Sequence, residues 1–451
     1  MRFQALACDY DGTLATHGHV GEDIVAALKT LRRSGRKLLM VTGRRLEELL
    51  TVFNHAALFD WIVAENGALL YRPATKEEVV LAEPPLPEFI QLLKSRGVTP
   101  IEVGRVIVAT WTPHETTVLE VIRDLGLGMQ IILNKGAVMV LPADVSKATG
   151  LRHALDKMGI SPHNVASVGD AENDHALLAI AECGVAVANA LEAVKLRADV
   201  VTVSDHGAGV AELIAQLVQD DLASWAPRLN RHAVTLGTAK DGQPFRLASV
   251  GATRRIVARS ADSLARWVNT FLTALSAAGY QWTLVTDATR EALAERRALP
   301  EGETPAASNE EAFASLIDPQ RNAVIHCTSQ NDSERIDYLQ SLIPQLTELW
   351  SNTGRPHWVV WMDAASLLRG AEVDFAALTP KHGVMLAQVA DRPEPIAAPD
   401  APPFVEEGVD VAMLDGRPSE ALRYRWESDQ LVFAAADPVS TAPAPITEKL
   451  L

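Results

Sequence analysis

The stretch F-Q-A-L-A-C-D-Y-D-G-T-L, residues 3–14, decides the fold of the first part of this chain. Residues 3–8 form an apolar run that predicts a short buried strand, and Gly12 interrupts the pattern soon afterwards. Asp9 and Asp11, at the carboxyl end of that strand, are predicted to project into one crevice. There one carboxylate can attack a phosphorus atom while the other moves protons and helps to hold a divalent cation. Taken alone, the stretch is also compatible with a strand that ends in an ordinary acidic turn.

Further apolar runs end in polar residues in the same way. Residues 38–41 lead into Thr42-Gly43-Arg44, and residues 61–64 lead into Glu65-Asn66-Gly67. A hydroxyl and free backbone N–H groups at a strand end suit a phosphate oxygen. Residues 165–168 lead into Gly169-Asp170-Ala171-Glu172-Asn173-Asp174, a carboxylate-rich turn of the kind that offers oxygen ligands to Mg²⁺.

Lys147 stands at the start of a predicted helix, K-A-T-G-L. A positive charge there is able to neutralise a phosphoryl group that two aspartates would otherwise repel. Each of these features is weak alone, but their order along the chain is informative.

This ordered set resembles the haloacid dehalogenase (HAD) superfamily of phosphohydrolases, specifically its Cof-like, type IIB branch, over about the first 220 residues. The resemblance implies an α/β fold, with a doubly wound parallel-sheet core formed by residues 1–71 and 142–222. A small α/β cap, residues 72–141, is expected to be inserted into it. Carbon–halogen chemistry is set aside, because it has no use for the second aspartate and the metal site.

The resemblance also implies roles for the matching residues. The implied catalytic residues are Asp9 as nucleophile, Asp11 as general acid and base, Thr42 and Lys147. The implied substrate-binding residues are Thr42, Gly43, Arg44, Asn66, Lys147 and Asn173. The implied ligands of a Mg²⁺ cofactor are Asp9, Asp11 through its backbone carbonyl, Asp170 and, in support, Asp174. Asp9 is then expected to form an aspartyl-phosphate, with phosphoryl transfer helped mainly by positioning and charge neutralisation.

The cap predicts the substrate class. Within it we expect helices over residues 87–96 and 114–125, a strand over residues 105–111, and a hairpin around Asn134-Lys135-Gly136. Caps of this kind exclude water, and their loops select the leaving group. The insert is short, which favours a compact substrate, either a sugar phosphate or a phosphorylated small acid. His114, Lys135 and Trp111 are candidate contacts, although ordinary structural roles explain each of them equally well.

Composition favours an enzyme of small molecules. A formal net charge of −16 over 451 residues disfavours nucleic acid and anionic membrane surfaces as partners. We find no apolar run of membrane-spanning length and no signal-peptide pattern. Cys8, Cys183 and Cys327 are far apart and mostly in apolar surroundings, so we expect buried free thiols in a reducing cytoplasm.

The second half, residues 232–451, is expected to begin after a boundary near residues 220–231. Its strand-like and helical stretches alternate, which predicts a second α/β domain with a parallel sheet. The phrases A-G-Y-Q (278–281) and T-G-R-P-H-W (353–358) resemble a P-loop ATPase domain of the HerA-like kind. Residues 393–403 are expected to form a proline-rich loop, residues 409–414 and 431–435 two closing strands, and the segment after Pro438 a frayed terminus.

The chemistry of a P-loop is missing from this half. A phosphate-binding loop needs the pattern G-x-x-x-x-G-K-[ST], but residues 259–266, R-S-A-D-S-L-A-R, contain neither glycine nor lysine. Alanine follows Asp363, at the position where a catalytic glutamate is expected. We therefore predict a degenerate, non-hydrolysing domain that serves scaffolding, regulation, or assembly with a second copy or a protein partner.

Two functions remain open from the sequence. The first is a Mg²⁺-dependent phosphatase of a small phosphorylated metabolite. The alternative is a non-enzymatic regulatory or scaffold protein whose first half senses a phosphorylated ligand. The intact set Asp9, Asp11, Thr42, Lys147 and Asp170 favours the phosphatase.

Overall fold

The structure is a computed structural model. It describes residues 1–229, 231–238, 243–247, 253–327, 331–367, 383–389, 411–414, 422–427 and 430–435. The chain divides into two compact units, Arg2–Arg231 and His232–Leu451, the latter with Met1. Among the described residues no helix combines the length and the apolar character needed to cross a membrane.

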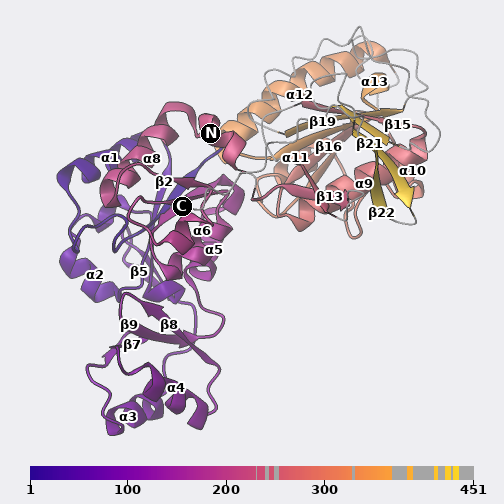
Figure 1. Cartoon of the computed structure of the whole chain (residues 1–451). Helices are drawn as coiled ribbons and strands as arrows, with labels where there is room; N and C mark the ends of the chain where they lie inside the picture. The colour runs from indigo at the N-terminus through magenta and orange to yellow at the C-terminus, as the bar shows by residue number, and fades with distance from the viewer. Residues whose placement is uncertain are drawn as a thin grey trace. The chain divides into compact units, whose positions relative to one another are not determined.

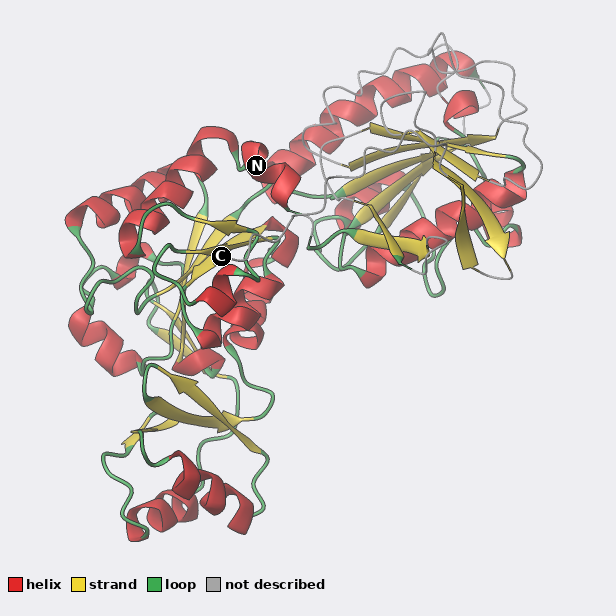
Figure 2. Ribbon diagram, in the orientation of Figure 1, coloured by secondary structure: helices red, strands yellow, loops and turns green. Residues whose placement is uncertain are grey.

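An eight-stranded sheet forms the centre of the N-terminal unit (Figure 2). In spatial order its strands are β12 (Val200–Val201), β11 (Cys183–Ala186), β10 (Val165–Gly169), β1 (Ala5–Asp9), β2 (Lys37–Val41), β3 (Trp61–Ala64), β4 (Leu69–Arg72) and β5 (Glu77–Val80). The pairs from β12 to β3 are parallel, whereas β4 and β5 run antiparallel at one edge. The carboxyl ends of β10, β1 and β2 therefore meet at one edge of the sheet, where open α/β sheets bind their ligands.

Helices cover both faces of this sheet. On one face lie α1 (Glu22–Arg33), α2 (Leu46–Val52) and α8 (His206–Asp220), and on the other α5 (Lys147–Met158) and α6 (His175–Ile180). A short α7 (Glu192–Lys195) and five 3-10 segments complete the unit: η1 (Ala56–Leu58), η2 (Glu65–Gly67), η3 (Pro162–Asn164), η4 (Glu172–Asp174) and η5 (Ala223–Arg228). In α1 the buried side chains Ile24, Leu28 and Leu31 recur at helical spacing and form one apolar face. The doubly wound α/β architecture predicted for this half is confirmed.

A second, smaller sheet belongs to the cap. It is antiparallel, in the order β6 (Glu102–Val103), β7 (Val108–Trp111), β9 (Ala137–Pro142) and β8 (Met129–Asn134). Helices α3 (Pro87–Ser95) and α4 (Glu115–Asp124) pack on it, and Figure 1 shows them on the side away from the core. The predicted helices, strand and hairpin are present, whereas the short strand β6 was not predicted. The predicted cap range also included residues 77–80, but these form β5 and pair with β4 in the core sheet.

The C-terminal unit contains a ten-stranded sheet. Its spatial order is β14 (Pro244–Leu247), β13 (Val234–Thr238), β22 (Gln430–Ala435), β21 (Leu422–Glu427), β20 (Val411–Leu414), β15 (Thr253–Ala258), β19 (Gly383–Val389), β18 (Trp358–Met362), β16 (Trp282–Thr286) and β17 (Ala323–His326). The five strands from β15 to β17 are parallel, while β20, β21 and β22 are joined by antiparallel pairs. The prediction of a parallel sheet is therefore correct for these five strands and for the β13–β22 pair, whereas β14, β20 and β21 form antiparallel pairs.

Two long helices lie on opposite faces of this second sheet. Helix α9 (Ala261–Ala277) packs on one face and α12 (Asp332–Thr353) on the other. The other helices among the described residues of this unit are α10 (Arg290–Glu295), α11 (Asn309–Ser315) and α13 (Ala364–Leu367). The closing strand expected at residues 431–435 is present as part of β22. The strand expected at residues 409–414 is described only from Val411. The predicted proline-rich loop at residues 393–403 and the segment after Pro438 lie outside the described residues.

Candidate active site

The carboxylate of Asp9 and the ammonium of Lys147 form the centre of the site. Asp9 is the last residue of β1 and pairs in register with Val41 of β2, so Thr42 follows at the same edge of the sheet. Lys147 Nζ lies 2.6 Å from Asp9 Oδ1. Both residues are almost completely buried, with 3% of Asp9 and 2% of Lys147 exposed.

Local sequence fixes where the helix of Lys147 begins. Ser146 caps α5, because its hydroxyl accepts from the Thr149 amide while the Thr149 hydroxyl accepts from the Ser146 amide. The helix start also packs tightly on the turn after β3. At Gly67, whose φ is +108°, a Cβ atom would lie 1.9 Å from the Ser146 carbonyl oxygen. Only glycine permits this approach, which brings Lys147 into the site.

The electrostatics of this pair follow from burial. Burial raises the pKa of Asp9 well above its ordinary value, and the charge of Asp174 adds to the effect, whereas Lys147 opposes it. Burial alone would lower the pKa of Lys147, but the charges of Asp174 and Asp9 raise it above its ordinary value instead. Lys147 is therefore a permanent positive charge between two carboxylates.

The turn after β10 supplies the remaining carboxylates. Asp174 accepts from Lys147 at 2.7 Å through Oδ1, and from the amides of Asp170 and Ala171 through Oδ2. Asp170 accepts from the Thr13 hydroxyl at 2.9 Å. Oxygen atoms of Asp9, Asp170 and Asp174 all lie within 4.8 Å of one another, and all three side chains are buried.

This cluster fits a magnesium ion. Carboxylate and carbonyl oxygens are the ligands that Mg²⁺ prefers. The ammonium of Lys135, 2.8 Å from Asp170 Oδ2 and 3.0 Å from the Asp11 carbonyl oxygen, occupies the position of a cation among these oxygens. Both carboxylate oxygens of Asp174 already accept hydrogen bonds, so its part as a ligand stays a prediction.

Asp11 directs its side chain to Arg44. The guanidinium donates to both carboxylate oxygens, from Nε at 2.6 Å and from a terminal nitrogen at 2.8 Å, and it also pairs with Glu48. This contact is a bidentate ion pair of the kind that fixes side-chain geometry. The structure thus brings Arg44, which was predicted to contact substrate, onto the predicted general acid and base.

The other predicted substrate-binding residues lie beside this centre. Thr42 is fully buried, and its hydroxyl accepts from the Arg44 amide at 3.1 Å. Asn66 has a φ of +53°, and its backbone N–H donates to the Thr42 carbonyl oxygen. Asn173 donates to Asn66 Oδ1 at 2.9 Å, so these two predicted residues are in direct contact. Gly43 lines the pocket described next.

A pocket of about 280 Å³ opens over Asp9 and Asp11. The core side of its wall includes Gly43, Arg44, Arg45 and Lys147, and the cap side includes Trp111, Asn134, Lys135 and Met139. Trp111 and Lys135, two of the candidate substrate contacts, therefore line this pocket. His114 does not, because its Nε2 lies 3.1 Å from the Thr99 carbonyl within the cap.

Glu65 joins the core to the cap, a role that the sequence pattern did not indicate. Its fully buried carboxylate accepts from the amides of Arg105, Val106 and Ile107, at 2.8, 2.9 and 3.0 Å. Those amides belong to the turn between β6 and β7. An acidic residue directly after an apolar strand was the available signal, but its partners lie about forty residues further along the chain.

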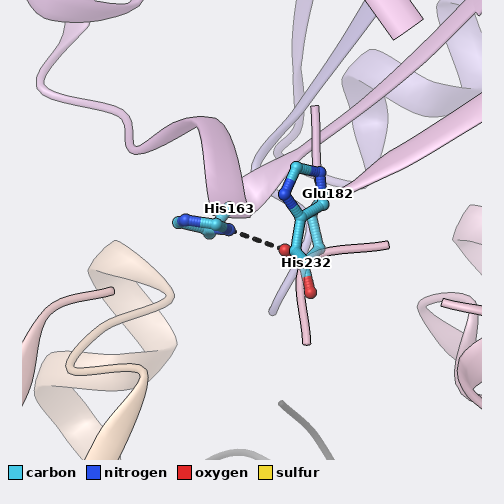
Figure 3. Close-up of side chains that lie close together, drawn as sticks. All are labelled: His163, Glu182 and His232. Carbon is cyan, nitrogen blue, oxygen red and sulfur yellow. Dashed lines mark hydrogen bonds and ion pairs between the residues drawn. The ribbon is translucent and has the colours of Figure 1, made fainter. Parts of the chain in front are cut away.

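A buried contact between a histidine and a glutamate lies at the opposite edge of the core sheet. His163 Nδ1 lies 2.7 Å from Glu182 Oε2, a contact that Figure 3 marks with a dashed line, and Arg2 forms an ion pair with Glu182. His163 precedes β10 and Glu182 precedes β11, so both lie at the amino ends of these strands. The pair is therefore remote from Asp9. His232, which Figure 3 also labels, is the first residue of the C-terminal unit.

Known proteins resemble the N-terminal half of the chain. A family described as haloacid dehalogenase-like hydrolase matches residues 6–108 and 120–214. A phosphoglycolate phosphatase from Pyrobaculum islandicum is 30% identical over 227 residues, which are 49% of this chain and 98% of that protein. One from Pyrobaculum aerophilum is 32% identical over 221 residues, 48% of this chain and 95% of that protein. A solved haloacid dehalogenase-like hydrolase from Bacteroides thetaiotaomicron is 19% identical with a TM-score of 0.42, over 48% of this chain and 99% of that one.

Proposed function

The chain belongs to the haloacid dehalogenase-like hydrolases and is a phosphoric monoester hydrolase, and from this premise we propose a magnesium-dependent phosphatase of a small phosphorylated acid. The observation that carries the proposal is the buried contact between Asp9 and Lys147 at the base of a pocket of about 280 Å³. A nucleophile, a permanent cation and a pocket of a size that suits a compact leaving group occur there together.

The residues suggest the following sequence of steps. A carboxylate oxygen of Asp9 attacks phosphorus and the ester P–O bond breaks, which gives an aspartyl-phosphate. Asp11 supplies the proton to the leaving alkoxide and then takes one from the water that hydrolyses the aspartyl-phosphate. Lys147, the Thr42 hydroxyl and the Gly43 amide hold the phosphoryl oxygens. Asp11 must release Arg44 to act, because both of its carboxylate oxygens are engaged in that ion pair.

Magnesium fits this scheme through the chain's own oxygens. Asp9, the Asp11 carbonyl and Asp170 would hold the ion, with Asp174 in support. When bound, it would offset the negative charge shared by the carboxylates and the phosphoryl group. Thr13 orients Asp170 for this purpose through its hydroxyl hydrogen bond.

The pocket wall offers cations to an acidic leaving group, but each of them already has an acidic partner. Arg44, Arg45 and Lys135 line the pocket, and the two arginines pair with carboxylates of the same wall, namely Asp11, Glu48 and Glu102. A carboxylate on the substrate would meet a positive charge there by replacing one of these partners. The two Pyrobaculum relatives are named for phosphoglycolate, a small phosphorylated acid. We therefore favour a phosphorylated small acid of that size over the sugar phosphate that the short cap equally allowed.

A substrate panel tests this proposal. Purified protein with Mg²⁺ is incubated with phosphoglycolate and with sugar phosphates, and released phosphate is measured; Asp9→Asn serves as the inactive control. We expect the highest kcat/KM for phosphoglycolate or a similar acid. Preference for a sugar phosphate would refute the substrate class, and release that persists in Asp9→Asn would refute the role of Asp9.

For the C-terminal unit we propose a P-loop-like α/β domain that does not bind nucleotide, and that serves scaffolding, regulation or assembly. Only Arg259 and Ser260 separate β15 from α9, and the Ser260 hydroxyl caps the helix by accepting from the Ser263 amide. A phosphate-binding loop needs a longer connection at this place, with glycines among its residues. In a thermal melt of the whole chain, we expect ATP to leave the transition of this unit unchanged. A real site at a hundredfold excess over its Kd would stabilise by about 2.7 kcal/mol and would be visible.

A further inference from the structure

Lys135 extends from the cap into the cluster of core oxygens. It lies at the tip of the hairpin between β8 and β9, where a two-residue turn of Lys135 and Gly136 has φ values of +50° and +87°. Positive φ at both positions is typical of a type I′ turn, the tight connection that suits twisted strands. The turn aims the lysine at the core. Its ammonium donates to the Asp11 carbonyl oxygen at 3.0 Å and to Asp170 Oδ2 at 2.8 Å.

These acceptors are two of the oxygens proposed above for magnesium. The ammonium also lies against Gly12, where a Cβ atom would be 2.3 Å from Lys135 Nζ and 2.5 Å from Asp170 Oδ2. The space around these oxygens is therefore filled by the lysine. Mg²⁺ binds oxygen at about 2.0–2.1 Å, so an ion on these two atoms would touch the ammonium, and the two positive charges would repel each other.

We propose that Lys135 is a cap-borne cation that holds the metal position while no metal is bound, and that Mg²⁺ must displace it to bind. This inference rests on the proposed function, because it uses the same metal site. The displaced ammonium has a place to go, since Lys135 lines the pocket and its side chain is half exposed. There it meets the bound substrate instead of Asp170.

The exchange couples metal binding to the cap. In the metal-free protein the ammonium ties the hairpin to Asp170 of the core, and that tie is lost when the metal enters. A ligand that must displace a competing group binds with an apparent Kd equal to its intrinsic Kd divided by the fraction of time that the site is free. Removal of the lysine charge therefore strengthens metal binding, whereas loss of an ordinary supporting contact would leave it unchanged or weaken it.

Magnesium affinity without substrate tests the inference. We would titrate Mg²⁺ alone into wild type, Lys135→Met and Lys94→Met by calorimetry. Lys94 is a matched control, because it is an exposed lysine of the same cap on α3. If Lys135 occupies the site nine-tenths of the time, Lys135→Met should lower the Kd by about tenfold, with Lys94→Met unchanged. An equal or higher Kd in Lys135→Met would overturn the inference.

A second measurement uses only the wild-type protein, so its outcome does not depend on whether a variant folds. Lysine side chains are acetylated with an amine reagent, with and without Mg²⁺, and modification at each lysine is read by mass spectrometry. We expect Mg²⁺ to increase modification of Lys135 at least severalfold relative to Lys94. Unchanged or reduced modification would overturn the proposal.

These readouts separate the two proposals. Tighter Mg²⁺ binding by Lys135→Met in a protein that hydrolyses no phosphorylated acid would refute the substrate class and leave this inference standing. Hydrolysis of a phosphorylated acid together with an unchanged Mg²⁺ affinity in Lys135→Met would support the substrate class and refute this inference.

Discussion

Lys147 Nζ lies 2.6 Å from Asp9 Oδ1, in a contact where neither side chain is more than 5% exposed. The same ammonium is 2.7 Å from Asp174, whose side chain is fully buried. One positive charge thus compensates two buried carboxylates that come from the ends of different strands. The site depends on this charge for its stability as well as for its chemistry.

Replacing Lys147 by Met should destabilise the N-terminal unit. Removal of one partner from a buried ion pair costs about 3–5 kcal/mol, because the remaining charge is left uncompensated. We would measure the free energy of unfolding in urea, with Lys157→Met as an exposed control on the same helix. Turnover should be lost as well. A stability within about 0.5 kcal/mol of wild type would contradict the importance of this pair.

The loss in Lys147→Met should also grow with pH. Lys147 lowers the pKa of Asp9, so without it the pKa of that buried carboxyl rises further above its value in the unfolded chain. A carboxyl with a raised pKa in the folded state makes folding less favourable as pH rises above the unfolded value near 4. The difference in the free energy of unfolding between Lys147→Met and wild type should therefore be larger at about pH 8 than at about pH 5.

Asp11→Asn should reduce turnover by about 10²- to 10⁴-fold, the usual contribution of a general acid and base. Because Asp9 remains, we expect aspartyl-phosphate to accumulate, detectable by acid quench with labelled substrate. Glu48→Gln, which alters the other carboxylate on Arg44, is the control and should retain more activity. Turnover within tenfold of wild type would remove Asp11 from the acid and base role.

Chelation should silence the enzyme. We expect EDTA to abolish phosphate release and excess Mg²⁺ to restore it, and Asp170→Ala to raise the Mg²⁺ concentration needed for half activation by at least about tenfold. Asp156→Ala, an exposed change on α5, should behave as wild type. Full activity in chelator would show that the carboxylate cluster serves another purpose.

Glu65→Gln should loosen the cap without touching the chemistry. The carboxylate satisfies three backbone amides, and an amide side chain presents an N–H group to donors, so a loss of about 1–3 kcal/mol is expected. Hydrogen exchange at residues 105–107 should accelerate, with a higher KM. Glu78→Gln, which removes only a surface contact of the Arg105 side chain, is the control. Unchanged protection of these amides from hydrogen exchange would argue against the role of Glu65 in holding the cap to the core.

The three cysteines should be unreactive in the folded protein. Burial raises the pKa of Cys327 to about 12, and it also raises the pKa of Cys8 and of Cys183. A raised pKa keeps the thiol protonated, and the thiolate is the reactive form. Near pH 8 a thiol reagent should therefore label none of them at a rapid rate, and all three after unfolding in urea. Rapid native labelling of one cysteine would contradict its burial.

Much of the site could be predicted because its residues lie at the ends of strands. Asp9, Thr42 and Asp170 each follow an apolar run, and parallel strands bring their carboxyl ends to one edge whatever the loops between them do. The start of α5 at Lys147 was predictable for a similar local reason, its Ser146 cap. In the C-terminal unit the same reasoning predicted an α/β domain with a parallel sheet, but it could not predict that β20 pairs with β15 antiparallel.

By itself the sequence determined where the core strands lie along the chain and which chemical groups stand at their ends, because these follow from local apolar patterns. The doubly wound core and its cap were implied by the family resemblance. Tertiary structure alone decided which of those groups touch. Lys135 contacts the Asp11 carbonyl across 124 positions of the chain, and Arg44 takes up both oxygens of the Asp11 carboxylate. Such contacts depend on how the cap hairpin and the core loops pack in three dimensions, and a hydrogen bond is made only when both groups arrive within about 3 Å.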